Sequence, residues 1–131
     1  MVKRVLFICV GNSFRSQMAE GFARHYAPRG VLVRSGGVNP ASGLSPAAVR
    51  LMGERDIDIS LHVPKAVDMA FASQADRIVT MGCTPEEACP AEVLDRAEEW
   101  SLADPGGMGE EEARGLRDEI ERRVRALVEQ L

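Results

Sequence analysis

The chain has 131 residues, 45% of them hydrophobic, which suits one compact domain spanning residues 1–131. No stretch approaches the ~20 consecutive apolar residues of a membrane span, and the opening Met-Val-Lys-Arg is not a secretion signal. The net charge of -4 argues against nucleic acid as a partner. We therefore expect a cytoplasmic protein, a monomer, that binds neither membrane nor nucleic acid.

Charge is unevenly distributed along the chain. Residues 1–35 hold six basic residues against the single acid Glu20, so this part is positive although the whole chain is acidic. A positive region of this kind suits a small anionic substrate. Solvated arginines on a helix face would explain most of these residues equally well, so only Arg15 is given a specific role.

The three cysteines cannot all pair with one another, which favours reactive thiols in a reducing compartment over a static disulfide framework. Zinc binding is the other common use of cytosolic cysteines. Cys9, however, is far along the chain from Cys83 and Cys89, and the histidines, His25 and His62, lack ligand spacing. We predict no metal and no tightly bound cofactor.

The first strand-to-helix turn carries a nucleophile and a cation. Residues 5–8 form an apolar run typical of a buried strand, and residues 16–26 have the pattern of a helix. The loop between them reads Cys9-Val10-Gly11-Asn12-Ser13-Phe14-Arg15-Ser16. Free N–H groups and the helix dipole at such a turn suit a tetrahedral oxyanion. Arg15 can hold two of its oxygens, and the same field favours a thiolate at Cys9.

We therefore predict Cys9 as the nucleophile and Arg15 as an oxyanion ligand. The substrate-binding residues are those of the loop: Val10, Gly11, Asn12, Ser13, Phe14, Arg15 and Ser16. Ser16 can donate a hydrogen bond to the thiolate or cap the helix, and Asn12 suits a left-handed backbone conformation. The alternative is a buried structural cysteine beside an unrelated surface arginine, which the glycine, asparagine and serine of the loop disfavour.

Strand and helix patterns alternate along the rest of the chain. Further strands are predicted at 31–34, 77–81 and near 96–100. Helices are predicted from Ser45-Pro46 through Met52, over 67–72, and weakly from Glu86-Glu87 until Pro90 interrupts the pattern. A final helix runs from about 110 to 131, and its apolar stripe is Leu116, Ile120, Val124, Leu127 and Leu131. Strands separated by helices predict an α/β fold with an open, mostly parallel sheet and helices on both faces.

Residues 9–21 resemble the active-site loop of the low-molecular-weight protein tyrosine phosphatase superfamily. They look most like its thioredoxin-coupled arsenate reductases, whose pattern Cys-x-Gly-Asn-Ser-x-Arg-Ser-Gln-Met-Ala-Glu-Gly they match without a gap. The phosphatase branch usually has proline where this chain has Gln17. The resemblance extends more loosely over nearly the whole chain, and it implies a four-stranded sheet of the flavodoxin-like type.

The Asp104-Pro105-Gly106-Gly107 segment, taken alone, is simply a turn. The superfamily, however, carries its general acid in an Asp-Pro motif at this place. The resemblance therefore implies that Asp104 protonates the departing oxygen. Tyrosine phosphatases usually follow this motif with aromatic residues that flank an aryl substrate, and this chain has glycines there.

Cys83 and Cys89 are separated by five residues, so a loop rearrangement could bring them within disulfide reach, or they could be two unrelated buried residues. Their surroundings, Thr-Met-Gly-Cys and Ala-Cys-Pro, resemble the redox segment of the arsenate reductases. The resemblance implies that these two cysteines relay oxidation away from Cys9 and that thioredoxin supplies the electrons.

Some members of the family bind potassium beside the loop through asparagine, glutamate, serine and a carboxylate. Asn12, Glu20 and Ser35 match this set, but Lys65 stands near the expected carboxylate. We predict no potassium ion here and expect the Lys65 ammonium in the same region.

Two enzymatic functions remain. In the first, an arsenate reductase uses Cys9, Cys83 and Cys89 in a relay. In the second, a phosphomonoester hydrolase forms a phosphocysteine that water cleaves, and no thiol is oxidised. The loop, Arg15 and Asp104 serve both, whereas the cysteine pair, Gln17 and the missing aromatic residues favour reduction. A catalytically silent anion-binding protein would leave the thiols without a purpose.

Overall fold

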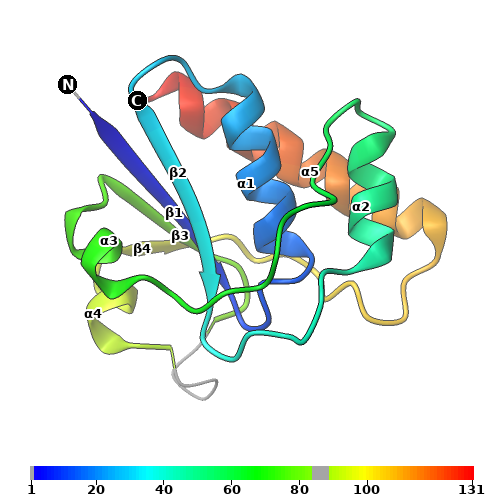
Figure 1. Ribbon diagram of the computed structural model, residues 1–131, viewed down its shortest axis with the longest axis horizontal. Coiled ribbons are helices and arrows are strands. Elements are labelled where there is room, and N and C mark those ends of the chain that lie inside the picture. Colours follow the sequence, from blue (N-terminus) through cyan, green and yellow to red (C-terminus); the bar gives the residue numbers. More distant parts are fainter. Residues whose placement is uncertain (1, 84–88) are drawn as a thin grey trace.

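The computed structural model describes residues 2–83 and 89–131. Four strands form one sheet in the order β2-β1-β3-β4, and each pair of neighbours runs parallel (Figure 1). The strands are β1 (Lys3–Cys9), β2 (Val31–Gly37), β3 (Arg77–Thr80) and β4 (Ala97–Glu99). The predicted open sheet is confirmed, and it is wholly rather than mostly parallel in the described part of the chain.

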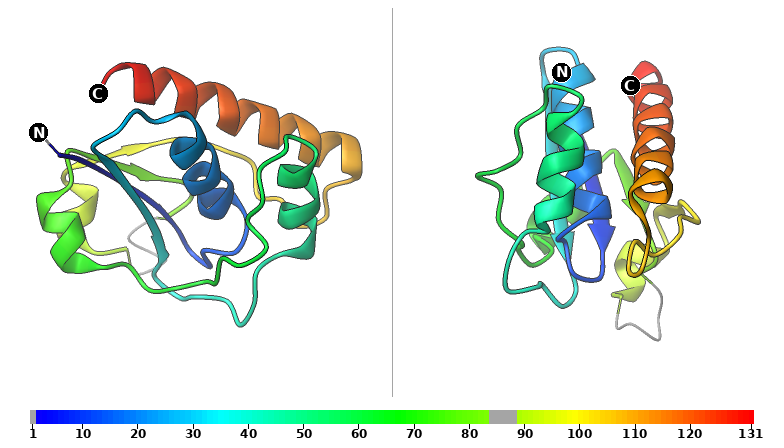
Figure 2. Two further views of the ribbon diagram at one scale, coloured as in Figure 1. Left: turned by 45° about the horizontal axis from the view of Figure 1, so that its top comes forward. Right: turned by 90° about the vertical axis from the view of Figure 1, so that its right-hand side faces the viewer.

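Helices cover both faces of the sheet, as expected. They are α1 (Arg15–Tyr26), α2 (Pro46–Gly53), α3 (Met69–Gln74), α4 (Ala91–Leu94) and α5 (Glu110–Glu129). The first, second and fifth helices pack on one face, and α3 and α4 pack on the other (Figure 1). Figure 2 shows the long α5 running beside α1, which it contacts extensively. None of the described helices is long and apolar enough for a membrane span.

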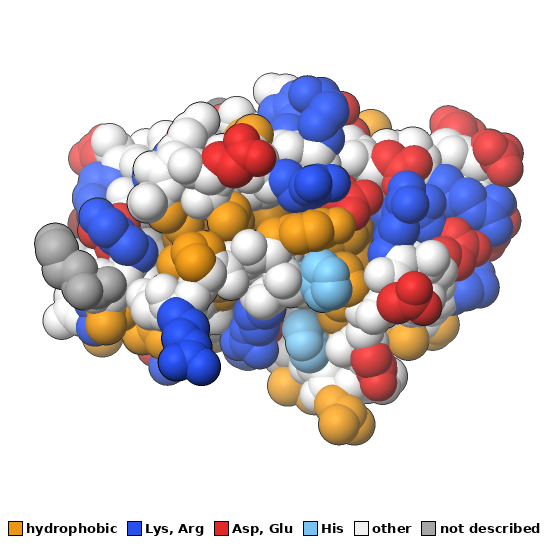
Figure 3. All heavy atoms as spheres, turned by 90° about the horizontal axis from the view of Figure 1, so that it is seen from above, with side chains coloured by type: hydrophobic (Ala, Val, Ile, Leu, Met, Phe, Trp, Pro, Cys, Tyr) orange, Lys and Arg blue, Asp and Glu red, His pale blue; other side chains and the backbone are white. Residues whose placement is uncertain are grey.

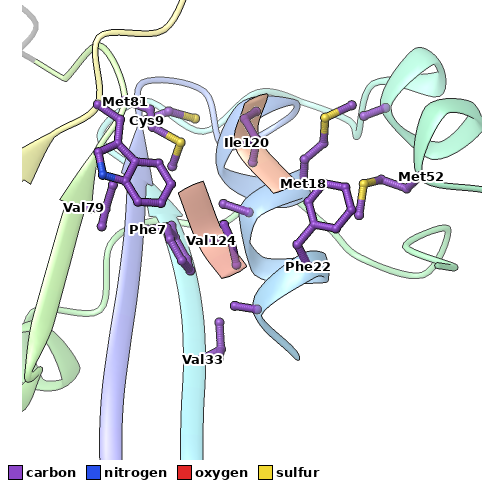
Figure 4. Packing of buried hydrophobic residues seen from close by; sticks show 14 of the residues in the cluster. Phe7, Cys9, Met18, Phe22, Val33, Met52, Val79, Met81, Ile120 and Val124 are labelled. Carbon is purple, nitrogen blue, oxygen red and sulfur yellow. The ribbon is translucent and has the colours of Figure 1, made fainter. Parts of the chain in front are cut away.

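The central strand β1 explains this layered arrangement. Because side chains alternate along a strand, Val5, Phe7 and Cys9 enter the core under α1 and α5, whereas Leu6 and Ile8 enter the core under α3 and α4. All five side chains are buried, as expected for a parallel strand covered on both faces. Figure 4 shows Phe7 and Cys9 within the larger of the two cores.

Local signals set most helix boundaries. Ser45 accepts a hydrogen bond from the Ala48 N–H at 3.3 Å, and Pro46 is the first residue of α2, as predicted. The start predicted for α3 at residue 67 is wrong, because the Asp68 side chain accepts from the Phe71 N–H and the helix begins at Met69. Glu86-Glu87 lies outside the described residues, and α4 begins only after Pro90.

The stripe predicted for the last helix is confirmed for Leu116, Ile120, Val124 and Leu127, which are all buried. Leu131 follows the end of α5 and is half-buried. The outer surface of α5 is charged, and Figure 3 shows acidic and basic side chains close together where α2 and α5 lie. The ion pairs that join α5 to α2 and the residues after it are Arg50–Glu110, Arg55–Asp118, Arg55–Glu121, Arg114–Glu54 and Arg117–Glu54.

Candidate active site

Cys9 ends β1 at the carboxyl edge of the sheet, and the loop that follows it leads into α1. The residue is buried, only 3% exposed. The Sγ atom lies 3.2 Å from the Asn12 N–H nitrogen and 2.9 Å from the Ser16 hydroxyl, so the expected hydrogen bond between Ser16 and Cys9 is present. Asn12 has a φ of 51°, the left-handed conformation that its residue type suits. The loop therefore curls tightly around the sulfur.

The carbonyl oxygens of the loop point away from the space inside it. They accept hydrogen bonds from the segment after β2: Asn39 N to Val10 O at 3.0 Å, Ala41 N to Gly11 O at 2.9 Å and Ser45 N to Ser13 O at 3.1 Å. In the described part of the chain, the N–H groups of residues 13–16 donate to no atom, and α1 has no side-chain cap. These free donors, at the positive end of a helix, form a cradle for an anion.

Two glycines allow the close approach of backbone to this loop. A Cβ atom on Gly37 would lie 2.5 Å from the Val10 oxygen, so only glycine lets β2 pass there. Gly82 has a φ of +82°, and a Cβ on it would lie 3.0 Å from the Nη1 atom of Arg15. Both sites fix where the loop and its arginine can lie.

Arg15 is half-buried, and its guanidinium lies between Gly82 and the segment that follows β4, where Nη1 is 3.5 Å from the Leu102 oxygen. No carboxylate pairs with it in the described part of the chain. By contrast, Arg24 and Arg34 pair with acids, Glu20 and Asp68. The positive charge of residues 1–35 is therefore partly neutralised, whereas Arg15 remains available to an anion.

Cys83 and Cys89 form a disulfide, with their Cα atoms 5.6 Å apart, and Cys9 is the free cysteine. Cys83 follows the end of β3, the strand that pairs with β1. Just past the end of β3, the Met81 N–H still donates to the Ile8 oxygen of β1 at 2.8 Å. The pair nevertheless belongs to the core under α3 and α4, whereas Cys9 belongs to the core under α1 and α5. The three sulfurs gather at one edge of the sheet but on opposite faces.

Asp104 is exposed, and its carboxylate accepts a hydrogen bond from the Gly106 N–H at 2.9 Å. The segment that carries it reaches the site at Leu102, whose oxygen contacts Arg15. The backbone of this segment thus reaches the site, whereas the Asp104 carboxylate points toward Gly106 in the turn that follows it. The acid role of Asp104 stays a prediction.

A polar network lies behind the loop. Ser35 donates to the buried carboxylate of Glu20 at 2.5 Å, and the Lys65 Nζ atom lies 3.2 Å from that carboxylate and 3.0 Å from the Ser35 oxygen. The expected location of the Lys65 ammonium is confirmed. Burial alone would raise the pKa of Glu20, but the Ser35 hydrogen bond and the nearby charges of Lys65 and Arg24 together hold this pKa below its usual value.

Gln17 joins the loop to the segment before Lys65. Its Nε2 donates to both oxygens of Asn12 and to the Val63 oxygen, each at 3.1 Å. Its Oε1 lies 2.9 Å from His62 Nδ1, so this ring nitrogen carries the proton. Burial lowers the pKa of His62 below its usual value. The sequence showed Gln17 only as a branch marker, and nothing in it signalled these contacts.

Glu99, at the end of β4, was missed by the sequence analysis. Its carboxylate accepts from the Thr80 hydroxyl at 2.8 Å and from the Gly82 N–H at 3.1 Å, so it fixes the start of the segment that carries Cys83. Among the described residues, no group of three or more His, Cys, Asp or Glu side chains is placed to hold a metal ion. The chemistry of the site therefore rests on Cys9, the anion cradle and the cysteine pair.

Comparison with known proteins agrees with this geometry. Arsenate reductase 2 of Staphylococcus saprophyticus is 38% identical over 124 residues, 94% of each chain. A solved structure of an arsenate reductase in the phosphate binding state superposes with a TM-score of 0.86, at 32% identity over 98% of each chain. A thioredoxin-dependent arsenate reductase of Corynebacterium glutamicum superposes with a TM-score of 0.81 at 35% identity, over 98% of this chain and 61% of that one.

A family model matches almost the whole sequence, residues 4–131, and thus spans the loop around Cys9, the cysteine pair and the segment of Asp104. Together with relatives more than 30% identical over most of their length, this match places the observed sheet and anion loop in one group of proteins. The chain belongs to the low molecular weight phosphotyrosine protein phosphatase family.

Proposed function

We propose that this protein is an arsenate reductase that thioredoxin returns to its reduced state. One observation carries the proposal: a free cysteine lies inside an anion loop, and an oxidised cysteine pair follows the neighbouring strand. A hydrolase needs the first feature and has no use for the second. The names of the relatives, arsenate reductases with over 30% identity, support the same conclusion.

In the first step, the loop N–H groups and Arg15 hold the arsenate oxygens. The Cys9 thiolate, stabilised by the Asn12 N–H and the Ser16 hydroxyl, attacks arsenic and forms a sulfur–arsenic bond. One arsenic–oxygen bond breaks, and Asp104 protonates the departing oxygen, so that water leaves. For this step the Asp104 carboxylate turns from the Gly106 N–H toward the cradle.

In the second step, the Cys83 thiolate attacks the sulfur of Cys9. A Cys9–Cys83 disulfide forms, the sulfur–arsenic bond breaks, and its electron pair stays on arsenic, which is thereby reduced from arsenate to arsenite. The Cys89 thiolate then attacks Cys83 and releases Cys9 as a thiolate. The resulting Cys83–Cys89 disulfide is the state that the structure holds. The two thiols of thioredoxin reduce it by the same exchange reaction.

The second step requires Cys83 to change faces of the sheet. Its sulfur lies in the core under α3 and α4, and Cys9 lies in the core under α1 and α5. A disulfide needs Cα atoms within about 7 Å of each other and Cβ atoms that point together. The oxidised pair therefore holds Cys83 away from Cys9, and reduction by thioredoxin releases it for the next cycle.

The alternative is hydrolysis of phosphomonoesters, which the family name and the shared Cys9–Arg15 loop favour. It needs Cys9, Arg15 and Asp104 but neither of the other cysteines. The described structure offers little to hold an aryl group, because Trp100 is buried in the core, Phe14 of the loop packs against that core, and Tyr26 ends α1, away from the loop. We therefore expect any phosphatase activity to be residual.

The test is an arsenate reduction assay with thioredoxin, thioredoxin reductase and NADPH, run beside an aryl phosphate assay. Cys83→Ser and Cys89→Ser should each abolish arsenate turnover and spare the weak phosphatase activity. Cys9→Ser should abolish both activities, because it removes the shared nucleophile. Each single Cys→Ser change removes one sulfur, so the three variants serve as controls for one another.

The relay variants should also stop at different points. After one exposure to arsenate, mass spectrometry should find a Cys9–Cys83 disulfide in Cys89→Ser and no disulfide to Cys9 in Cys83→Ser. Should the wild type hydrolyse aryl phosphates rapidly, and should both relay variants reduce arsenate as well as it does, the relay is wrong and the protein is a phosphatase.

A further inference from the structure

The carboxylate of Glu20 is buried on α1, only 2% exposed. A buried charge is costly unless cations and hydrogen bonds compensate it. Two cationic groups reach its oxygens, Lys65 at 3.2 Å and Arg24 at 3.2 Å, and the His62 ring lies 3.7 Å away. Of these, only the Lys65 ammonium also contacts Ser35. Lys65 is therefore the cation connected to the hydrogen bonds that lead toward the loop.

Groups that can only donate or only accept determine the direction of each hydrogen bond in this network. The Lys65 ammonium can only donate, and the Glu20 carboxylate can only accept. Ser35 therefore accepts from Lys65 and donates its proton to Glu20 at 2.5 Å. Its oxygen accepts a second bond from the Asn12 amide Nδ2 at 3.0 Å. No proton of Ser35 remains for any other partner.

The same logic continues to the sulfur. The second proton of the Asn12 amide goes to the Ser16 oxygen at 2.7 Å. Ser16 already accepts this bond, so its own proton is free to be donated to Cys9 Sγ at 2.9 Å. A sulfur that accepts from Ser16 and from the Asn12 N–H is favoured as a thiolate. The hydrogen-bond network thus presents a donor, the Ser16 hydroxyl, and not an acceptor to the Cys9 sulfur.

Lys65 also fixes the orientation of the Asn12 amide. The Asn12 Oδ1 accepts from the Lys65 backbone N–H at 3.0 Å and from Gln17 Nε2 at 3.1 Å. A flipped amide would direct its NH₂ group at these two donors, so the observed orientation is the satisfied one. Lys65 therefore holds Asn12 directly through its backbone and, through Ser35, by its ammonium.

We propose that Lys65 is a positioning residue: its ammonium, acting through Glu20, Ser35 and Asn12, keeps Ser16 donating to Cys9 and so keeps the nucleophile ionised. The inference rests on the proposed role of Cys9 in the reaction. Without the ammonium, the negative potential of Glu20 opposes a second anion at Cys9, or Glu20 binds a proton and no longer orders Ser35. Both outcomes disfavour the thiolate.

The experiment measures how the rate of Cys9 alkylation by iodoacetamide depends on pH. The protein is used with Cys83 and Cys89 oxidised, because Cys9 is then the free cysteine. Lys65→Met removes the charge and keeps the length of the side chain. The chain offers a matched control, because Lys3 is its only other lysine and begins β1, at the opposite end of the strand from Cys9.

Lys65→Met should move the midpoint of the profile upward by about one pH unit, and alkylation at pH values below both midpoints should slow about tenfold. Lys3→Met should overlay the wild type, and Lys65→Arg, which keeps the charge, should recover most of the loss. All variants keep the other titratable and charged groups near the hydrogen-bond network and the loop, which are Arg15, Arg24, His62 and Asp104. A Lys65→Met profile that coincides with the wild type overturns the proposal.

A second variant covers the case in which Lys65→Met folds poorly, as checked by urea unfolding. The double variant Glu20→Gln, Lys65→Met removes both charges, so its midpoint should return toward that of the wild type. A midpoint as high as that of Lys65→Met alone would refute the electrostatic route through Glu20. Because alkylation needs no arsenate, it tests the role of Lys65 independently of the proposed function. If the wild type failed to reduce arsenate, only the proposed function would be refuted.

Discussion

The effect of the Ser16 hydrogen bond on the pH dependence of Cys9 alkylation can be predicted. Ser16 is fully buried, and its hydroxyl lies 2.9 Å from the sulfur. A hydrogen bond to a charged group contributes about 1.5–3 kcal/mol, and about 1.4 kcal/mol corresponds to one pH unit in a titration. Ser16→Ala should therefore raise the midpoint of Cys9 alkylation by about one to two pH units. The Asn12 N–H bond remains, so the thiolate is weakened but not lost.

The same change also costs stability. In Ser16→Ala, the Asn12 amide loses the oxygen that accepts its Nδ2 proton at 2.7 Å. A buried donor without a partner costs about 1–3 kcal/mol. Urea unfolding should show a loss of this size. The oxidised protein is again the right sample, because only Cys9 then carries a free thiol.

Ser45→Ala is the matched control for this experiment. Ser45 caps α2 by accepting from the Ala48 N–H, so its loss should cost about 1 kcal/mol of stability. Its backbone N–H still binds the Ser13 oxygen and supports the loop. The control should lose stability and keep the alkylation profile of the wild type. An unchanged profile in Ser16→Ala would refute the idea that this hydroxyl stabilises the thiolate.

Two further predictions concern catalysis and acid stability. Asp104→Ala should slow release of a poor leaving group at least about 100-fold in single-turnover assays. Inhibition by phosphate should stay nearly unchanged, because Arg15 and the loop hold the anion. Unchanged turnover would remove Asp104 from the mechanism. Hydrogen bonds from Arg114 and Arg117 lower the pKa of Glu54 from 4.5 to about 2, so the stability they contribute is complete above pH 4.5 and is lost as pH falls toward 2. Glu54→Gln should flatten this loss in urea midpoints measured from pH 6 to pH 2.5, and parallel curves for the two proteins would contradict the assignment.

The sequence was sufficient wherever structure is determined by neighbours along the chain. The apolar run 5–8 and the loop after it specify a strand, a turn and a helix within one short segment, and the structure has them there. The stripe of α5 was equally clear, because helical spacing selects one face. The start of α3 was misplaced although its signal was present, since Asp68 stands three residues before the Phe71 N–H that it caps.

Contacts between side chains distant in sequence could not be predicted in the same way. Gln17 and His62 are 45 residues apart, and their contact depends on how the segment after α2 passes the loop. The Glu99 carboxylate reaches Gly82 from a neighbouring strand, across 17 residues. Composition and periodicity carry no information on such pairs, since each residue alone is an ordinary polar side chain. Lys65 was located in advance only through the family resemblance.

The opposite faces of Cys9 and Cys83 follow from one backbone angle. Val79 and Met81 enter the same core as Cys9 (Figure 4), so continued alternation would send the side chain two residues later, Cys83, to that face as well. Gly82 interrupts the alternation with its φ of +82°, and Cys83 enters the other core with Cys89. A return of Gly82 to an extended conformation would restore the alternation and turn Cys83 toward Cys9. In the proposed relay, Gly82 is therefore the residue at which a backbone change would carry Cys83 from Cys89 to Cys9, and glycine is the residue type that adopts both conformations without strain.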